Sequence, residues 1–411
     1  MELCWLDISL DYEHLSLCDR SFYGWISLPG LTISEFSIKE YASIGIPIRV
    51  FWCCLNEFRL HTAEVIEPNA KEEKMKFINS IRTIGEINTQ EKTYHVAFTG
   101  TQNYIPWIGV AMASIMEHNQ AHFMFHILLD KTTEEDISAF EEFAQHWNVA
   151  IVLYYMNDDM LSQYCRFRRY LIDGKYVAAL MYRFIIPEIM RTFADRVLYL
   201  DGDVVCNGDI TKFIDMDLNG GIAIAAAEDL CGEKYARQLK IRRYFNSGVL
   251  LINVKRWNAE NITSRIMERI RKESVENPFM PCPDQDILNI YLANKTHFVS
   301  HKYNLPYRLV QASFFKPKII NEDTRQASLV HFIGAIKPWT TYNQSVPIVK
   351  VWAQAKANSP WKDVPLHAPS SQKAIHQAAR DARRRHCYGE MMMWYVRFLK
   401  SKLDGTRAAG Y

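Results

Sequence analysis

Short apolar runs alternate with helical patterns through the middle of this chain. From Thr93 onward, four runs have the character of buried β-strands: YHVAF, FMFHILL, VAIVLYY and RVLYL. Runs of this length and composition are typical of strands covered on both faces. The segments between them carry apolar residues at helical spacing: IPWIGVAMASIMEHN, TTEEDISAFEEFAQHW and KYVAALMYRFIIPEIM. This alternation predicts an α/β fold with a single, mostly parallel, doubly wound sheet.

Further elements are expected on either side of this core pattern. Thr132 and Glu135 are spaced as a capping box at the start of the second helical segment. After RVLYL, we expect two strands (GIAIAAAED and GVLLINVKRW), two helices (NITSRIMERIRKESVEN and PDQDILNIYLA) and a last strand or loop (ASLVHFIGAIKPW). The segment KDVPLHAPSSQ, with two prolines, predicts a linker before a helical C-terminal piece.

The composition favours a globular protein with one large domain and appendages. Of 411 residues, 48% are hydrophobic and 23% charged, which excludes collagen-like and low-complexity classes. The nine cysteines form no C-x-x-C pair, so we expect free thiols in a reducing cytoplasm. The N-terminal MELCWLDISLDYEH lacks the features of a signal peptide, and no run reaches the ~18 apolar residues that span a bilayer. Any membrane contact is therefore expected to be peripheral.

Two carboxylates, Asp201 and Asp203, directly follow the strand RVLYL. In an extended chain they share one face, about 7 Å apart along the backbone. Ligands of such sheets bind beyond the carboxyl ends of the strands, and Gly202 leaves room for one to approach. Carboxylate oxygens suit Mg²⁺ that also binds phosphates, which predicts a site for a nucleotide diphosphate. The alternative is a simple turn, because Asp-Gly is a common turn dipeptide.

The segment VHFIGAIKPW spaces His331, Gly334 and Lys337 three residues apart. The imidazole could complete a metal shell, the glycine permits close backbone approach, and the lysine offers a charge for phosphate. The alternative is a buried histidine and a surface lysine before Pro338.

Other polar residues stand where a ligand would need them. Arg183, inside an apolar helical pattern, requires a carboxylate or phosphate partner unless it reaches solvent. Asp284, Gln285 and Asp286 fall at an expected helix N-terminus, where they either border a reacting sugar or complement the helix dipole. Three further residues at strand ends could bind sugar hydroxyls or form turns: Glu228, Asp229 and Asn246.

The C-terminal segment from Lys373 to Leu403 is basic, with eight Lys/Arg against two acidic residues. Apolar residues at helical spacing suggest an amphipathic helix: Met391, Trp394, Tyr395, Phe398 and Leu399, with Arg397, Lys400 and Lys402 on other faces. Such a helix could lie in an anionic membrane interface or dock on the catalytic domain.

Four segments in order, VLYLDGDVV, YFNSGVLLINVKRW, PDQDILNIYL and HFIGAIKPW, resemble those of the family 8 glycosyltransferases. The resemblance spans about residues 93–345. It implies a GT-A catalytic domain there, preceded by an extension of unknown role over residues 1–92. Residues 346–411 resemble the C-terminal domain of a subgroup that extends the lipopolysaccharide core, which comprises α-1,2-glucosyltransferases and α-1,3-galactosyltransferases. The basic run ARDARRRH within this basic amphipathic helical domain favours membrane association over docking, because a phosphorylated lipid acceptor would lie at the membrane.

The positions that match the family's functional residues form four groups: metal ligands (Asp201, Asp203, His331); donor phosphate and sugar contacts (Gly202, Gly334, Lys337, Arg183); uridine contacts (Asn103, Tyr104); and the reacting centre (Gln285 facing the anomeric carbon, Asp286 beside it, Asp229 and Asn246 near the donor or acceptor sugar). One position departs from the pattern. Thr101 stands where relatives carry the acidic residue that reads uracil, so base selectivity rests on a weaker hydrogen-bonding group.

The resemblance implies transfer of glucose or galactose from a UDP-sugar to a growing lipopolysaccharide core, with an α-linkage and with Mg²⁺ or Mn²⁺ assisting the departure of UDP. It implies a cytoplasmic enzyme at the inner face of the cytoplasmic membrane that binds no nucleic acid. Alternatives are another glycan or glycolipid acceptor, a non-catalytic sugar-binding relative, or a nucleotidyltransferase. A dinucleotide-dependent oxidoreductase is disfavoured because no G-x-G-x-x-G follows the early strands.

Overall fold

The computed structural model describes residues 27–28, 31–32, 77–87, 92–165, 167, 171–172, 175–176, 178–280, 282–309 and 326–403. The chain divides into two compact units, Met1–Asn69 and Ala70–Tyr411. In the first, the described residues form one antiparallel pair, β1 (Ser27–Leu28) and β2 (Leu31–Thr32). Most of the extension expected over residues 1–92 therefore lies outside the described residues.

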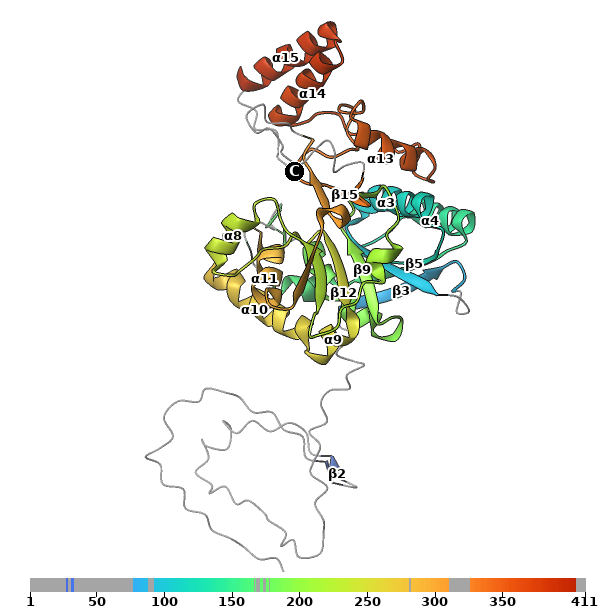
Figure 1. Cartoon of the computed structure of the whole chain (residues 1–411), viewed down its shortest axis with the longest axis vertical. Coiled ribbons are helices and arrows are strands. Elements are labelled where there is room, and N and C mark those ends of the chain that lie inside the picture. Colours follow the sequence, from blue (N-terminus) through green and yellow to red (C-terminus); the bar gives the residue numbers. More distant parts are fainter. Residues whose placement is uncertain are drawn as a thin grey trace, which may run out of the picture. The chain divides into compact units, whose positions relative to one another are not determined.

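The second unit is built on an eight-stranded mixed sheet, which confirms the predicted α/β class (Figure 1). Six strands run in one direction, and β12 and β3 run antiparallel to their neighbours. In spatial order the strands are β13 (Thr296–Val299), β11 (Ile224–Ala227), β12 (Val249–Asn253), β9 (Arg196–Leu200), β4 (Thr93–Thr99), β5 (His122–Leu129), β6 (Ala150–Met156) and β3 (Ile78–Ile84).

Both faces of the sheet are covered because successive residues of its central strands are apolar and point to opposite faces. In β4, Val96 and Phe98 enter one hydrophobic cluster and Ala97 the other. The first cluster includes α3 (Ile105–His118), α4 (Glu134–Trp147) and α13 (Pro347–Ala357). The second includes η4 (Ala178–Phe184), α6 (Ile186–Ile189), α9 (Val254–Ala259), α10 (Ile262–Glu276) and α11 (Pro283–Leu292).

Short elements connect these layers. They are η2 (Gln102–Tyr104), α5 (Asp158–Ser162), the hairpin of β7 (Leu171–Ile172) and β8 (Lys175–Tyr176), η5 (Met190–Thr192), α7 (Thr211–Ile214), α8 (Gly232–Leu239) and η6 (His301–Tyr303).

A second, three-stranded sheet corrects the prediction of a single sheet. Its order is β10 (Val204–Cys206), β15 (Leu329–Phe332) and β14 (Leu305–Tyr307). The chain turns out of the main sheet directly after β9, where the amide of Val204 donates to the carbonyl of Asp201 at 3.1 Å. β10 then pairs antiparallel with β15, with Val204 opposite His331. This register brings His331 beside the turn that carries the two carboxylates.

Three local predictions need correction. The capping box at the start of α4 uses Thr133 and Asp136, because the hydroxyl of Thr132 is engaged with the hydroxyl of Tyr155 at 2.9 Å. The third helical pattern forms β8, η4, α6 and η5 rather than one α-helix, since Pro187 lacks an amide hydrogen and restricts the residue before it. The run GVLLINVKRW is a strand only to Asn253, whose side chain caps α9.

The C-terminal segment consists of α13 and the adjacent helices α14 (Gln372–Arg384) and α15 (Tyr388–Leu403) (Figure 1). The predicted linker at 362–372 carries no helix or strand before α14, yet it is anchored, because the amide of His367 donates to the carbonyl of Trp339 at 2.9 Å. No helix among the described residues is long and apolar enough to cross a membrane. The five described cysteines form no disulfide: Cys165, Cys206, Cys231, Cys282 and Cys387.

Candidate active site

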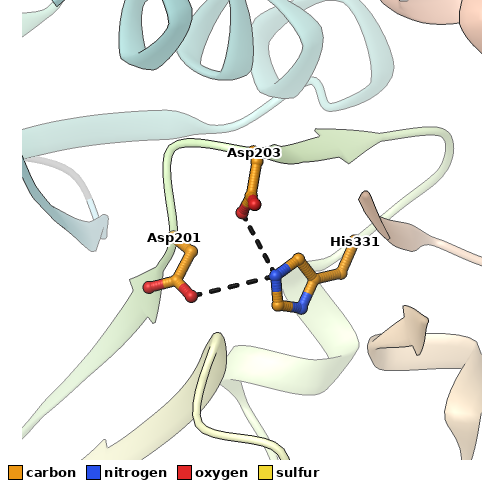
Figure 2. Close-up of side chains that lie close together, drawn as sticks. All are labelled: Asp201, Asp203 and His331. Atoms are coloured by element: carbon orange, nitrogen blue, oxygen red, sulfur yellow. Dashed lines mark ion pairs between the residues drawn. The ribbon is translucent and has the colours of Figure 1, made fainter. Parts of the chain in front are cut away.

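Three side chains from two sheets converge at the carboxyl end of β9. Asp201 and Asp203 lie on the turn between β9 and β10, and His331 points toward both from β15 (Figure 2). His331 Nε2 is 3.1 Å from Asp203 Oδ1 and 3.8 Å from Asp201 Oδ2. One ligand atom from each residue lies within 4.8 Å of the others. Two carboxylate oxygens and an imidazole nitrogen form a donor set for a divalent cation.

The hydrogen bonds of His331 show that this cluster fits a cation. Its Nδ1 is 3.1 Å from Asn246 Oδ1, which also accepts from the amide of Gly248. Because that oxygen is an acceptor, Nδ1 carries the proton, and in neutral imidazole the Nε2 lone pair faces the carboxylates. A lone pair beside two negative groups is repulsive unless a positive charge lies between them. The residues therefore favour a metal ion or a proton at this point.

Lys337 contributes a positive charge on the other side of Asp203. Its Nζ donates to Asp203 Oδ2 and, at 2.8 Å, to the carbonyl of Phe332. Burial alone would raise the pKa of Asp203, but the charge of Lys337 and the contact with His331 outweigh it and hold that pKa well below its usual range. Asp203 is therefore an anion at neutral pH.

Arg183 is buried, with 6% of its surface exposed, and reaches the cluster from η4. Its guanidinium lies 3.3 Å from Asp201 Oδ1 and 3.4 Å from Asp284 Oδ2, and it donates to Ser247 Oγ at 3.1 Å. The structure thus supplies the carboxylate partners that the sequence required for this arginine, and rules out the alternative that it extends into solvent. A buried guanidinium held in this way offers a fixed positive charge to an incoming anion.

Asn246 links the metal-site residues to the candidate reacting centre. Its Oδ1 accepts from His331, Gly248 and Asn304, and its Nδ2 donates to Asp229 Oδ2 at 3.0 Å. Because all these hydrogen bonds are formed within the protein, Asn246 orients the side chains of His331 and Asp229. A direct contact between Asn246 and a sugar stays a prediction.

Gln285, at the start of α11, is held by four hydrogen bonds. Its Oε1 accepts from Ser247 N at 2.8 Å and Oγ at 3.1 Å, and its Nε2 donates to the hydroxyl of Tyr244 at 3.1 Å and to Asp229 Oδ2 at 3.5 Å. Asp286 is buried; it accepts from the hydroxyl of Tyr244 at 2.6 Å and from the amide of Cys282 at 3.3 Å. Asp286 thus lies behind Gln285 and reaches it through Tyr244, so the geometry gives it a supporting position.

The predicted nucleotide-binding residues lie on η2 and beside it. Asn103 and Tyr104 are exposed, and Thr101 precedes η2 without a side-chain capping bond. A Cβ atom on Gly202 would lie 3.0 Å from Ile108 Cγ1 and 3.6 Å from the ring of Tyr104. Gly202 therefore lets the carboxylate turn pass close to the start of α3. Gly334 has φ +93°, a conformation that favours glycine.

Several site residues were missed by sequence reasoning. Tyr199 is fully buried and donates to Asp201 Oδ1 at 2.5 Å. Gly248 packs directly against His331 and Asp201, and Ser247 contacts both Arg183 and Gln285. Tyr199 precedes Asp201 by two residues, so in an extended chain the two side chains point the same way, and Ser247 and Gly248 directly follow Asn246. These positions were therefore detectable, but only once the pairing of β9 with β12 is known.

Fold and site together define an α/β protein with a cluster of candidate metal ligands at the carboxyl edge of its main sheet. The family model described as "Glycosyl transferase family 8" matches residues 95–343, and "Glycosyl transferase family 8 C-terminal" matches residues 347–402. The chain belongs to glycosyl transferase family 8, which confirms the resemblance read from its motifs.

Curated relatives cover most of both chains. The chain is 30% identical over 318 residues to the Lipopolysaccharide 1,3-galactosyltransferase of Salmonella typhimurium, covering 75% of this chain and 91% of the relative. It is 31% identical over 305 residues to a Lipopolysaccharide 1,2-glucosyltransferase of Escherichia coli K12, covering 71% and 85%.

Among solved structures, the galactosyltransferase LgtC in complex with donor and acceptor sugar analogs superposes with a TM-score of 0.52 at 22% identity, covering 64% of this chain and 96% of that chain. At this identity the likeness shows the shared fold alone, which is of the GT-A-like type expected from the resemblance.

Proposed function

We propose that this chain is a retaining hexosyltransferase that moves glucose or galactose from a UDP-sugar to a growing lipopolysaccharide core oligosaccharide, forming an α-linkage. The observation that carries the proposal is the cluster of Asp201, Asp203 and His331 with two cationic side chains beside it. The names of the relatives, a 1,3-galactosyltransferase and a 1,2-glucosyltransferase, support hexose transfer to lipopolysaccharide.

Asp201, Asp203 and His331 would hold Mg²⁺ or Mn²⁺. When bound, such an ion supplies positive charge to the diphosphate as it leaves the sugar. His331 is pre-oriented for this role by its bond to Asn246, and Asp201 by its bond from Tyr199. These two side chains therefore need little rearrangement to bind the ion.

The cationic side chains of the chain bind the diphosphate. Lys337 donates to Asp203 and would redirect part of this hydrogen bonding to a phosphate oxygen. Gly334, which has no side chain, would let the backbone approach the diphosphate closely. Arg183, fixed between Asp201 and Asp284, points its charge at the same region. Both charges stabilise negative charge that grows as the glycosidic bond to phosphate breaks. Thr101, Asn103 and Tyr104 would contact the uridine.

Gln285 bears on how the configuration is retained. An uncharged amide is a poor nucleophile, and its oxygen already accepts two hydrogen bonds from Ser247. We infer that the acceptor hydroxyl attacks from the face that UDP leaves: the bond between the anomeric carbon and phosphate oxygen breaks, the bond to the acceptor oxygen forms, and the departing phosphate takes the acceptor proton. Gln285 would orient the sugar, with Asp229 and Asn246 bordering it. A covalent sugar found on Gln285 of the wild type by mass spectrometry would contradict same-face attack.

The outer face of α15 is our candidate for contact with an anionic membrane at the cytoplasmic face. The apolar residues expected to form this face partly pack inward: Trp394 lies against the core, and Tyr395 and Phe398 contact the ring of His376 on α14. Leu399 of the predicted set is exposed, together with four apolar residues that were not predicted; we call these five the α15 stripe: Tyr388, Met392, Met393, Val396 and Leu399. The exposed Arg397, Lys400 and Lys402 on the same helix suit anionic headgroups.

A metal-dependence screen tests the proposed function. The full chain is incubated with each UDP-hexose and with Mn²⁺, Mg²⁺ or a chelator, and the release of UDP is measured. We expect release from UDP-glucose or UDP-galactose that the chelator abolishes. Asp203→Asn should lower the rate at least about 100-fold, while Asp209→Asn, a control at an exposed aspartate between β10 and α7, should not. Metal-independent release, or none from any UDP-hexose, would overturn the proposal.

A further inference from the structure

Trp339 lies two residues beyond Lys337 and joins two parts of the site. It is 4% exposed and stacks on Trp107 of α3, with ring centroids 5.0 Å apart and planes 1° from parallel. The ring of Tyr104 meets it edge-on, at 6.0 Å and 85°. One indole ring thus touches both the helix that follows η2 and the tyrosine at the end of η2.

The backbone around Trp339 is fixed from several directions. Its carbonyl accepts from the amide of His367 at 2.9 Å, and Thr340 Oγ1 donates to the carbonyl of Lys337 at 3.1 Å. Gln344 Nε2 donates to the carbonyl of Pro338 at 2.9 Å. These bonds fix the backbone of the loop that carries both Lys337 and Trp339. A displacement of the indole ring would therefore also move Lys337.

We propose that Trp339 is a positioning residue for the donor nucleotide, which rests on the proposed function. Its ring supports Tyr104, where the uridine is expected, and its backbone holds Lys337, where the diphosphate is expected. Through this one residue the two ends of the nucleotide site keep a fixed separation. A preformed separation lowers the ordering cost of binding the nucleotide.

If Trp339 only stabilised the fold, its replacement would weaken UDP binding no more than the replacement of another buried tryptophan in the same cluster. Trp352 is that other tryptophan. Trp352 of α13 is 2% exposed and lies in the same aromatic cluster. Its ring centroid is 6.0 Å from that of Trp107 and 6.3 Å from that of Trp339. No ring contact between Trp352 and Tyr104 is found in the described part of the chain. Replacing either indole by leucine removes a comparable volume from one cluster, so Trp352→Leu is the matched control.

The test is calorimetric binding of UDP in the presence of Mn²⁺ to the full chain, with the melting temperature measured in parallel. We expect Trp339→Leu to raise the Kd of UDP at least about 10-fold, and Trp339→Phe, which keeps a ring, to raise it less. Trp352→Leu should leave the Kd within about 2-fold at a similar loss of melting temperature. Equal effects of Trp339→Leu and Trp352→Leu on the Kd would overturn the proposal.

A double-mutant cycle keeps the test valid if Trp339→Leu does not fold. Tyr104 is 41% exposed, so Tyr104→Leu should preserve the fold. We expect the effects of Tyr104→Leu and Trp339→Phe on the UDP Kd to be non-additive, and additive effects would contradict the inference. If the wild type binds no UDP with Mn²⁺, the proposed function fails and the inference fails with it. If the wild type binds UDP and the Trp339 variants bind it with the same Kd, the inference alone fails.

Discussion

The substitution Gly248→Ala should displace the candidate metal ligands His331 and Asp201, against which Gly248 packs. A Cβ atom there would lie 2.2 Å from His331 Cε1, 2.7 Å from Nδ1 and 2.8 Å from Asp201 Oδ2. Because non-bonded carbon atoms need about 3.5 Å, the imidazole would have to retreat by about 1.3 Å. It has little space to do so, since His331 is 5% exposed, lies in a paired strand and is bonded to Asn246.

The expected magnitude combines overpacking with a weakened hydrogen bond. Overpacking costs about 1–3 kcal/mol and a lost internal hydrogen bond about 1 kcal/mol, so Gly248→Ala should lower the free energy of unfolding by about 2–4 kcal/mol. Displacing a metal ligand should also weaken Mn²⁺-dependent UDP binding by about 10–100-fold. Urea unfolding measures the first quantity and calorimetry the second.

Gly389→Ala is the matched control for this substitution. A Cβ atom there meets nothing within 4 Å, and Gly389 lies in α15, so the change should be neutral or stabilise by up to about 1 kcal/mol. The reasoning would be refuted if Gly248→Ala unfolded within about 0.5 kcal/mol of wild type and bound Mn²⁺ and UDP with unchanged affinity.

Two further predictions concern acid stability and membrane contact. Burial lowers the pKa of His95 to about 4, below the unfolded value of about 6.5, so the stability it contributes is complete above pH ~6.5 and is lost as pH falls toward 4. In urea unfolding, His95 alone should account for a loss of about 2 kcal/mol in the free energy of unfolding between pH 7 and pH 5, and burial of His126, whose pKa is also lowered, should add to it; an unchanged pH dependence in His95→Gln would contradict this. Replacing Met392 and Val396 by aspartate should weaken binding to anionic liposomes at least about 10-fold, whereas replacing the even more exposed Val275 and Phe279 should not. Equal binding by both double variants would exclude the α15 stripe.

The sequence predicted the parts of the fold that depend on local pattern. The buried runs and the helices α3, α10 and α11 follow from apolar periodicity and are present as expected. The second sheet was not predictable in this way, because β10 has three residues and pairs with the distant β15, where His331 lies opposite Val204. Strand pairing across such separations depends on tertiary contacts rather than on local pattern.

The candidate site was predicted in its chemistry but not in its connections. The motifs around Asp201, Asp203 and His331 were visible, and the structure brings the three side chains together. The need of Arg183 for an anionic partner followed from burial, yet its partners Asp201 and Asp284 emerge only when η4, β9 and α11 meet. Likewise, periodicity identified α15 as amphipathic, but which apolar side chains pack and which stay exposed depends on α14.

The most direct test of the central claim is the structure of the product. The full chain, Mn²⁺ and the active UDP-hexose are incubated with a lipopolysaccharide core acceptor, and the new linkage is assigned by NMR. The proposal predicts one added hexose in α-linkage, formed only when metal is present and at least about 100-fold more slowly with Asp203→Asn. A β-linked product, or transfer that continues at the wild-type rate in Asp203→Asn, would contradict the account.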